Sequence, residues 1–189
     1  MRRHQLAVAP RITYGALLRS GLEMCGAQNR VFASVDSELR RQFAASECVL
    51  TDSGTSALVL ALRMLLPKNG VVALPGYGCV DITSAVQYAG VKARLYDIDP
   101  RTLSPDLDSL QRAIQRGVDA VLVAHYYGYP ADMAGVRALT SRAGIPVLED
   151  AAQAASGSLD GQPLGSLGDV SILSFGRGKG LFEIGRAHV

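Results

Sequence analysis

Short apolar runs alternate with helical segments from residue 48 onward, and this order constrains the fold more than any other feature of the chain. The runs lack alternating polar residues, which is typical of strands buried on both faces of a parallel sheet. We therefore predict an α/β fold, with a mostly parallel sheet and helices on both faces. The predicted strands span 48–50, 71–74, 93–96, 120–124, 146–148 and 170–173.

The segments between these runs carry helical signals. Apolar residues recur at helical spacing over 58–66, and the Asn-Gly pair at 69–70 is predicted to end that helix. The Ser-Pro-Asp segment at 104–106 is typical of a helix start with Ser104 as the N-cap, and Asp132 is predicted to cap the following helix. Further helices are predicted at 14–24 and 34–45, and a loop or hairpin at 156–167.

Composition argues against several kinds of partner. With 48% apolar and 19% charged residues, the 189-residue chain is ordinary for one buried domain. Its formal charge of +2 gives no electrostatic case for nucleic acid, and no stretch approaches the length needed to cross a membrane. Cys25, Cys48 and Cys79 form no CxxC pair, and the apolar run 6–9 is too short for a signal peptide. We therefore expect a cytoplasmic protein with no metal site, in which the cysteines are reduced thiols in the core or lining a site.

Polar and aromatic residues follow the predicted strand ends, where parallel sheets bind ligands. Together they suit a planar, phosphorylated, nitrogen-containing ring. These residues lie in Ser53-Gly54-Thr55, Gly76-Tyr77-Gly78, His125-Tyr126, Asp150 and Ser174. The loop 51–56 precedes a helix whose free N–H groups and dipole would favour a phosphate, although such loops also cap helices without any ligand.

Three side chains are predicted to contact the ring itself. Tyr77 lies between two glycines, where it can stack on a ligand or pack into a turn. Asp150 follows a buried strand and needs a partner, which a protonated pyridine nitrogen would supply; capping a turn is the alternative. Gln153 lies within reach of a ring hydroxyl if a helical turn follows Asp150. Glu149 is the other candidate acid, but strand alternation points it elsewhere.

Lysine is scarce, and the chain contains only Lys68, Lys92 and Lys179. Lys68 lies in a turn and Lys92 just before a strand, so both are predicted to face solvent. Lys179 follows a Gly-Arg-Gly segment that can present it to the ligand edge of the sheet. Near other cations, or desolvated, its amine would become a nucleophile towards an aldehyde. A surface lysine in a flexible loop is the alternative interpretation.

With these residues in place, residues 50–179 resemble the DegT/DnrJ/EryC1/StrS family of sugar aminotransferases, which depend on pyridoxal 5'-phosphate (PLP) and have fold type I. The most specific matches are Ser-Gly-Thr-Ser-Ala-Leu at 53–58, Glu-Asp-Ala-Ala-Gln-Ala at 149–154, and Ser174-Phe175 followed after three residues by Lys179. Supporting matches occur at 96–99, 125–128, 131–133 and 165–169.

The resemblance implies a role for each predicted site residue. Lys179 would be the catalytic residue, binding PLP covalently and moving the proton between substrate and cofactor. Asp150 would pair with the pyridine nitrogen, Gln153 would contact the ring hydroxyl, and Tyr77 would stack on the ring. The remaining cofactor-binding residues would be Ser53, Gly54, Thr55 and Ser174, with the last three at the phosphate.

The resemblance also implies an activity. An amino acid, commonly glutamate, would give its amino group to the cofactor, and a keto sugar attached to a nucleotide would receive it. Such reactions serve polysaccharide or secondary-metabolite biosynthesis. Members of the family build each active site across a homodimer.

Two other functions remain open on the sequence. The first is another PLP enzyme of the same fold, such as a lyase, an aldolase or a sugar dehydratase. Some dehydratases of the family carry histidine where this chain has Lys179, which disfavours them. The second is a non-catalytic nucleotide-binding α/β domain, but neither GxGxxG nor GxxxxGKS/T follows the first predicted strand.

The chain departs from the family in two places. Its lysine loop reads Gly-Arg-Gly-Lys-Gly, where many members have His-Pro-x-Lys-Asn. Members also continue beyond the lysine into a small C-terminal domain. We therefore expect an N-terminal fragment, inactive and poorly stable alone, with the small domain absent. The expected division is an N-terminal arm or helix at 1–33, an incomplete PLP-binding large domain at 34–182, and a non-native tail at 183–189 that matches a sequencing-adapter translation.

Overall fold

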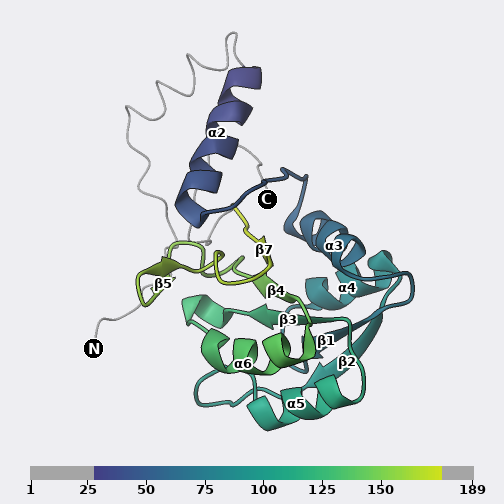
Figure 1. The fold of residues 1–189 in the computed structure, drawn as a ribbon. Helices are drawn as coiled ribbons and strands as arrows, with labels where there is room; N and C mark the ends of the chain where they lie inside the picture. Colours follow the sequence, from purple (N-terminus) through teal and green to yellow (C-terminus); the bar gives the residue numbers. More distant parts are fainter. Residues whose placement is uncertain (1–27, 176–189) are drawn as a thin grey trace.

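The computed structural model describes residues 28–175, and a five-stranded parallel sheet organises this part of the chain (Figure 1). Its strands are β1 (Val71–Pro75), β2 (Lys92–Tyr96), β3 (Ala120–Ala124), β4 (Val147–Asp150) and β7 (Val170–Ile172). They lie in the order β2-β1-β3-β4-β7, and every pairing is parallel. The chain runs outward through β2 on one side and through β4 and β7 on the other. A topological switch point therefore lies between β1 and β3.

Helices cover both faces of this sheet (Figure 1). The helices are α3 (Gly54–Leu65), α4 (Val80–Ala89), α5 (Leu107–Gln115) and α6 (Met133–Ala143). On β3, Leu122 packs with side chains of α3 and α4, whereas Val121 and Val123 pack with side chains of α5 and α6. This arrangement confirms the predicted α/β fold, because all residues of β3 are buried.

A third, smaller core cluster lies under α2 (Gln28–Phe43). Leu39 and Phe43 of α2 pack against Leu173 and Phe175, which follow β7. The helix predicted at 34–45 is therefore present, although it begins earlier than its apolar pattern indicated. Its contacts fix the segment that leads from β7 toward the predicted cofactor lysine.

The strand predicted at 48–50 is wrong, because this segment is a connection outside the sheet. Cys48 and Leu50 pack against the third cluster, but Val49 is 53% exposed. A central strand of a parallel sheet needs both faces covered, and this run has only one covered face. The segment leads to Ser53, the N-cap of α3.

The end of α3 differs from the prediction. The helix ends at Leu65, with Leu66 extended at φ −112° and ψ 143°, so the Asn-Gly pair at 69–70 does not end it. Pro67 follows directly, and a proline disfavours helical backbone angles at the residue before it. The proline therefore ends the helix before the glycine can.

The N-cap of α5 is Asp106 and not Ser104, so this prediction is also wrong. The Asp106 carboxylate accepts a hydrogen bond from the N–H of Ser109 at 2.7 Å. Ser104 instead accepts a hydrogen bond from the N–H of Asp132 at 3.1 Å. Asp132 caps α6 as predicted, because its carboxylate accepts from the N–H of Gly135.

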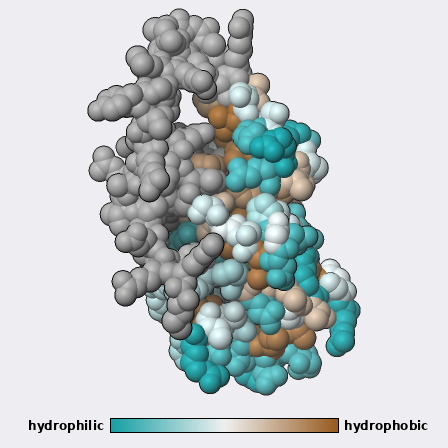
Figure 2. All heavy atoms as spheres, turned by 90° about the vertical axis from the view of Figure 1, so that its left-hand side faces the viewer, coloured by the Kyte–Doolittle hydropathy of each residue, from teal (hydrophilic) through white to brown (hydrophobic). Residues whose placement is uncertain are grey.

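The Gly- and Ser-rich region 156–167 contains the antiparallel pair β5 (Ser158–Leu159) and β6 (Gln162–Pro163), as predicted. The helix predicted at 14–24 and Lys179 lie outside the described residues. Within residues 28–175, no helix is long and apolar enough to span a bilayer, and no cluster of side chains is suited to a metal ion. Figure 2 shows one face, on which hydrophilic and hydrophobic residues are interspersed.

Candidate active site

A cavity of about 310 Å³ lies at the carboxyl ends of the central strands. Residues that follow β1, β3, β4 and β7 all line it, which places it beside the topological switch point. Its size is at the lower end of the range for small-molecule sites, roughly 300–1,000 Å³. The cavity brings together six of the predicted cofactor-binding residues, namely Ser53, Gly54, Thr55, Asp150, Gln153 and Ser174.

The N-terminus of α3 forms one wall of the cavity. The Ser53 hydroxyl oxygen accepts a hydrogen bond from the N–H of Ser56 at 3.0 Å and caps the helix. Ser174, which follows β7, lies close to this N-terminus, since a Cβ on Gly54 would be 3.9 Å from its hydroxyl oxygen. The first N–H groups of a helix have no partner within it, and the dipole favours negative charge there. The helix N-terminus and the Ser174 hydroxyl together fit an anion such as a phosphate.

Asp150 ends β4 with its half-buried side chain at the cavity. One carboxylate oxygen accepts a hydrogen bond from the N–H of Ala152 at 3.0 Å. The residue therefore caps a turn and also lines the cavity, so the two interpretations of the sequence describe one conformation. A carboxylate in this position can accept a hydrogen bond from a protonated ring nitrogen.

Gln153 is oriented by a backbone contact. Its side-chain oxygen accepts a hydrogen bond from the N–H of Tyr127 at 2.8 Å. Because a backbone N–H needs an acceptor, this contact fixes which end of the amide is oxygen. The NH₂ end is then the part that can donate to a ligand, for example to a ring oxygen.

Tyr77 lies beside the cavity and does not line it. Its side chain is 48% exposed, and its hydroxyl is 2.6 Å from the hydroxyl of Tyr127. Its ring packs edge-on against Tyr126, with centroids 5.5 Å apart and planes at 68°. Tyr126, in turn, does line the cavity.

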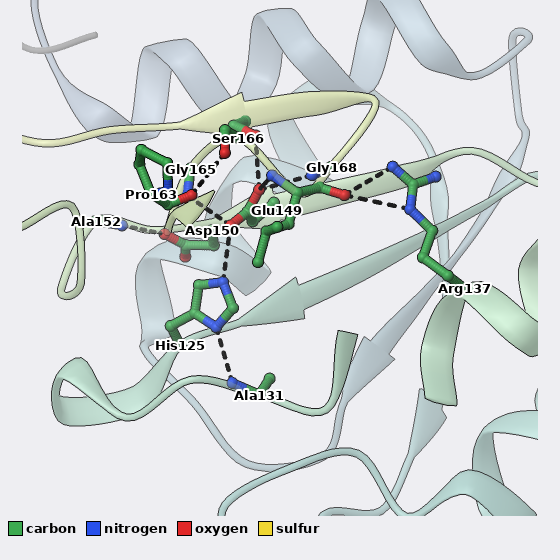
Figure 3. Close-up of polar contacts among 12 residues, drawn as sticks. His125, Ala131, Arg137, Glu149, Asp150, Ala152, Pro163, Gly165, Ser166 and Gly168 are labelled. Carbon is green, nitrogen blue, oxygen red and sulfur yellow. Dashed lines mark hydrogen bonds and ion pairs between the residues drawn. The ribbon is translucent and has the colours of Figure 1, made fainter. Parts of the chain in front are cut away.

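Glu149 precedes Asp150 on β4 and points away from the cavity lining into a buried network (Figure 3). Its side chain is fully buried. The carboxylate accepts hydrogen bonds from five groups, which are the ring of His125, the backbone of Gly165, Leu167 and Gly168, and the hydroxyl of Ser171. A Cβ on Gly168 would lie only 2.7 Å from that of Glu149, so the loop closes this tightly because residue 168 is glycine.

The hydrogen bonds of His125 define its tautomer. Its Nδ1 accepts from the N–H of Ala131 at 3.0 Å, so Nε2 carries the proton and donates to Glu149 at 2.8 Å. Burial alone would raise the pKa of Glu149, but the hydrogen bonds from His125 and the loop N–H groups outweigh it. The pKa of Glu149 therefore lies below its ordinary value, and the carboxylate is ionised at neutral pH. This network joins β3, β4 and β7, whose ends carry the candidate site.

Sequence reasoning missed part of the cavity wall. Asp81 and Ile82, in the first turn of α4, line the cavity and were not predicted. Cys79, the residue before that helix, also lines it, in keeping with the interpretation of the cysteines as core or site-lining thiols. Cys79 donates a weak hydrogen bond to Asp81 at 3.4 Å. The position of these residues just after β1 was the available signal, because all of the strand ends meet at the same edge.

The parallel sheet with helices on both faces is the fold of the large domain of fold type I PLP-dependent enzymes, and the solved structures that this chain resembles share it. The model of the DegT/DnrJ/EryC1/StrS aminotransferase family matches residues 13–185. The chain belongs to this family.

The chain is 37% identical over 134 residues to the UDP-N-acetyl-3-dehydro-alpha-D-glucosamine 3-aminotransferase of Acidithiobacillus ferrooxidans, covering 70% of this chain and 36% of that protein. It is 36% identical to the L-glutamine:2-deoxy-scyllo-inosose aminotransferase of Streptoalloteichus tenebrarius, covering 86% of this chain and 40% of that one. NtdA of Bacillus subtilis, solved with bound cofactor PMP, superposes with a TM-score of 0.73 at 29% identity. The match covers 82% of this chain and 35% of that one. The chain therefore spans less than half the length of these relatives.

Proposed function

We propose that the full-length gene product is a PLP-dependent aminotransferase that moves an amino group from an amino acid to a keto sugar attached to a nucleotide. The observation that carries this proposal is the meeting of the α3 N-terminus, Asp150, Gln153 and Ser174 around one cavity. The family and the names of the relatives support the same reaction class. We further propose a homodimer in the cytoplasm.

The residues of the cavity fit PLP. Gly54, Thr55 and Ser174 would hold the phosphate, with Ser53 as a further cofactor-binding residue, since the N-terminus of α3 and the Ser174 hydroxyl lie close together at the cavity. Asp150 would accept a hydrogen bond from the ring nitrogen, and the NH₂ group of Gln153 would donate to the ring oxygen.

When bound, PLP supplies an aldehyde that condenses with amines and a ring that withdraws electrons from the bonds of the substrate. The negative charge of Asp150 would hold the proton on the ring nitrogen, which sustains that electron withdrawal. Gln153 would stabilise negative charge on the ring oxygen. Lys179 would bind the cofactor covalently and then, as the free amine, take a proton from the substrate carbon and return it.

The relatives' names suggest substrate classes. One relative is named for a ketone on a UDP-linked amino sugar, and another for a cyclitol ketone with L-glutamine as donor. For this protein we propose glutamate as the donor and a nucleotide-linked keto sugar as the acceptor. Glutamine and free cyclitol ketones are therefore the comparisons that a substrate screen must include.

The proposal predicts stoichiometric amine transfer from glutamate. The full-length gene product, loaded with PLP, should release about one 2-oxoglutarate per active site without an acceptor and continue only when a ketone acceptor is present. Quantifying 2-oxoglutarate with a coupled dehydrogenase measures this. Elimination products in place of 2-oxoglutarate would identify a lyase. The absence of any PLP-dependent change in absorbance would identify a non-catalytic domain, and either result would contradict the proposal.

A further inference from the structure

We propose that Asp81 determines which acceptor the enzyme takes, by accepting hydrogen bonds from hydroxyl or N–H groups of an uncharged keto sugar. This inference rests on the proposed function, because it names the chemical class of the acceptor at the same site. Asp81 lies in the first turn of α4 and lines the cavity. Its carboxylate has no assigned partner on the cofactor, and its exposed position suits contact with the larger substrate.

Asp81 belongs to the rim of the cavity. Among the described residues that line the cavity, only Cys79 and Asp81 are exposed, and the others are buried or half-buried. Both follow β1, whereas Asp150 ends β4, and β3 lies between these two strands in the sheet. The cavity therefore has a half-buried carboxylate that follows from β4 and an exposed carboxylate that follows from β1.

The cofactor leaves Asp81 free for another ligand. Its ring has one basic atom, the pyridine nitrogen, which is proposed to pair with Asp150. Its phosphate is negatively charged and suits the N-terminus of α3, where a carboxylate would repel it. The NH₂ group of Gln153 is available for the ring oxygen. A second carboxylate at the cavity is therefore available to the substrate.

The protein also leaves this carboxylate with unused capacity. Asp81 accepts a weak hydrogen bond from the Cys79 thiol at 3.4 Å, whereas a carboxylate has about four acceptor positions. In the part of the chain that the structure describes, Asp81 forms no ion pair, and no lysine or arginine lines the cavity. The remaining acceptor positions suit the hydroxyl or N–H groups of a ligand.

The size of the cavity decides which substrate reaches the rim. Its volume of about 310 Å³ is small for a ligand site, and the bound cofactor would occupy much of it. An acceptor that carries a nucleotide must then extend past the rim, whereas an amino-acid donor is far smaller. Asp81 is therefore placed to contact the acceptor more than the donor.

The chemistry of a carboxylate defines the preferred acceptor. Hydrogen bonds from neutral donors to a carboxylate are stronger than those between neutral groups, and sugar hydroxyls are such donors. A keto uronate brings a carboxylate of its own, which has no proton to donate and is repelled. We therefore infer that the enzyme prefers an uncharged keto sugar to the matching uronate.

Asp108 provides the matched control for Asp81. An acid in the first turn of a helix also interacts favourably with the helix dipole, whether or not a ligand is near. Asp108 is exposed in the first turn of α5 and does not line the cavity. Asp108→Asn therefore makes the same chemical change at the same helical position without affecting the proposed acceptor contact.

The test uses the full-length gene product and separates the two half-reactions. Asp81→Asn, Asp81→Ala and Asp108→Asn are compared with the wild type by following the absorbance of the bound cofactor. One experiment mixes the PLP form with glutamate, and the other mixes the PMP form with the keto sugar. The acceptors are the nucleotide-linked keto sugar with the highest turnover in the substrate screen and its uronate, in which the last sugar carbon is a carboxylate.

We expect Asp81→Asn to raise the half-saturating concentration of the keto sugar about tenfold, the effect of losing one hydrogen bond to a charged group, and that of glutamate by less than about twofold. Asp81→Ala should raise the value for the keto sugar at least as much. The wild type should prefer the uncharged acceptor, and Asp81→Asn should narrow that preference. Asp108→Asn should match the wild type in both half-reactions.

Three results would overturn the inference and leave the proposed function standing. These are an unchanged acceptor constant in both Asp81 variants, equal losses in the two half-reactions together with weaker PLP binding, and a wild type that prefers the uronate. The last comparison needs no variant, so it decides even if an Asp81 variant fails to fold. A wild-type protein that transfers no amine from glutamate would overturn the proposed function itself.

Discussion

Replacing Glu149 with alanine is expected to destabilise the protein by about 3–5 kcal/mol, as removal of one partner from a buried pair does. The substitution leaves five donors around an empty buried position, including the His125 ring N–H and the N–H groups of the loop at 165–168. Native proteins are stable by only about 5–15 kcal/mol, so little folded variant should accumulate. Urea unfolding followed by circular dichroism measures the loss.

Glu38→Ala provides the matched control for this prediction. Glu38 lies on α2 and is exposed, and within residues 28–175 it pairs only with Arg41, one helical turn away. Surface pairs of this kind contribute little to stability, so its urea midpoint should equal that of the wild type. A Glu149→Ala variant with the same midpoint as Glu38→Ala would show that the buried network does not stabilise the fold.

The Glu149 network also predicts a dependence on pH. The pKa of Glu149 is lowered from 4.5 in the folded state, so its ionised form contributes stability above that pH. This contribution is lost as the pH falls through the lower, folded-state pKa. The difference in unfolding free energy between wild type and Glu149→Gln should be constant from neutral pH down to about 5 and shrink below 4.5. A difference that grows on acidification would contradict the assignment.

Asp150→Asn is expected to lower kcat for transamination by about 10²–10³-fold, the usual cost of losing one preorganised electrostatic contact. Asparagine can still accept the hydrogen bond from the N–H of Ala152, so the turn after β4 should remain. The loss would therefore report the charge of the carboxylate and not its capping contact. Steady-state turnover of glutamate with a ketone acceptor, in the full-length gene product, provides the measurement.

The control for Asp150 is Asp106→Asn. Asp106 makes an equivalent capping contact at the start of α5, but it does not line the cavity. This variant should keep wild-type kcat. If Asp150→Asn turned over as fast as Asp106→Asn, the proposed pairing with the ring nitrogen would be wrong.

Local pattern was enough to predict most of the sheet and the polar residues at its edge. β3 has five buried residues in a row, and such a run is typical of a central strand in a parallel sheet. Asp150 and Ser174 were predictable for the same reason, because parallel strands bring their carboxyl ends together. The strand prediction at 48–50 was wrong because three apolar residues do not reveal whether one face of the segment or both will be covered.

Features that depend on distant partners were not predictable. Strand alternation indicated that Glu149 points away from Asp150, but nothing local identified His125 and the loop at 165–168 as its partners. Likewise, the Ser104 hydroxyl binds Asp132 instead of capping α5, which only the tertiary fold reveals. Tyr126 lines the cavity with its hydroxyl donating to the backbone carbonyl oxygen of Tyr77, in space that Gly78 leaves open because it has no side chain.

We propose that the ε-amino group of Lys179 binds PLP covalently, and a direct chemical capture tests this. The full-length gene product, loaded with PLP, is reduced with borohydride and digested, and the peptides are sequenced by mass spectrometry. We predict a phosphopyridoxyl group on Lys179 and on neither Lys68 nor Lys92, with no label in a Lys179→Ala variant. Label on another lysine, or none on Lys179 in protein that has bound the cofactor, would show that Lys179 does not bind PLP covalently.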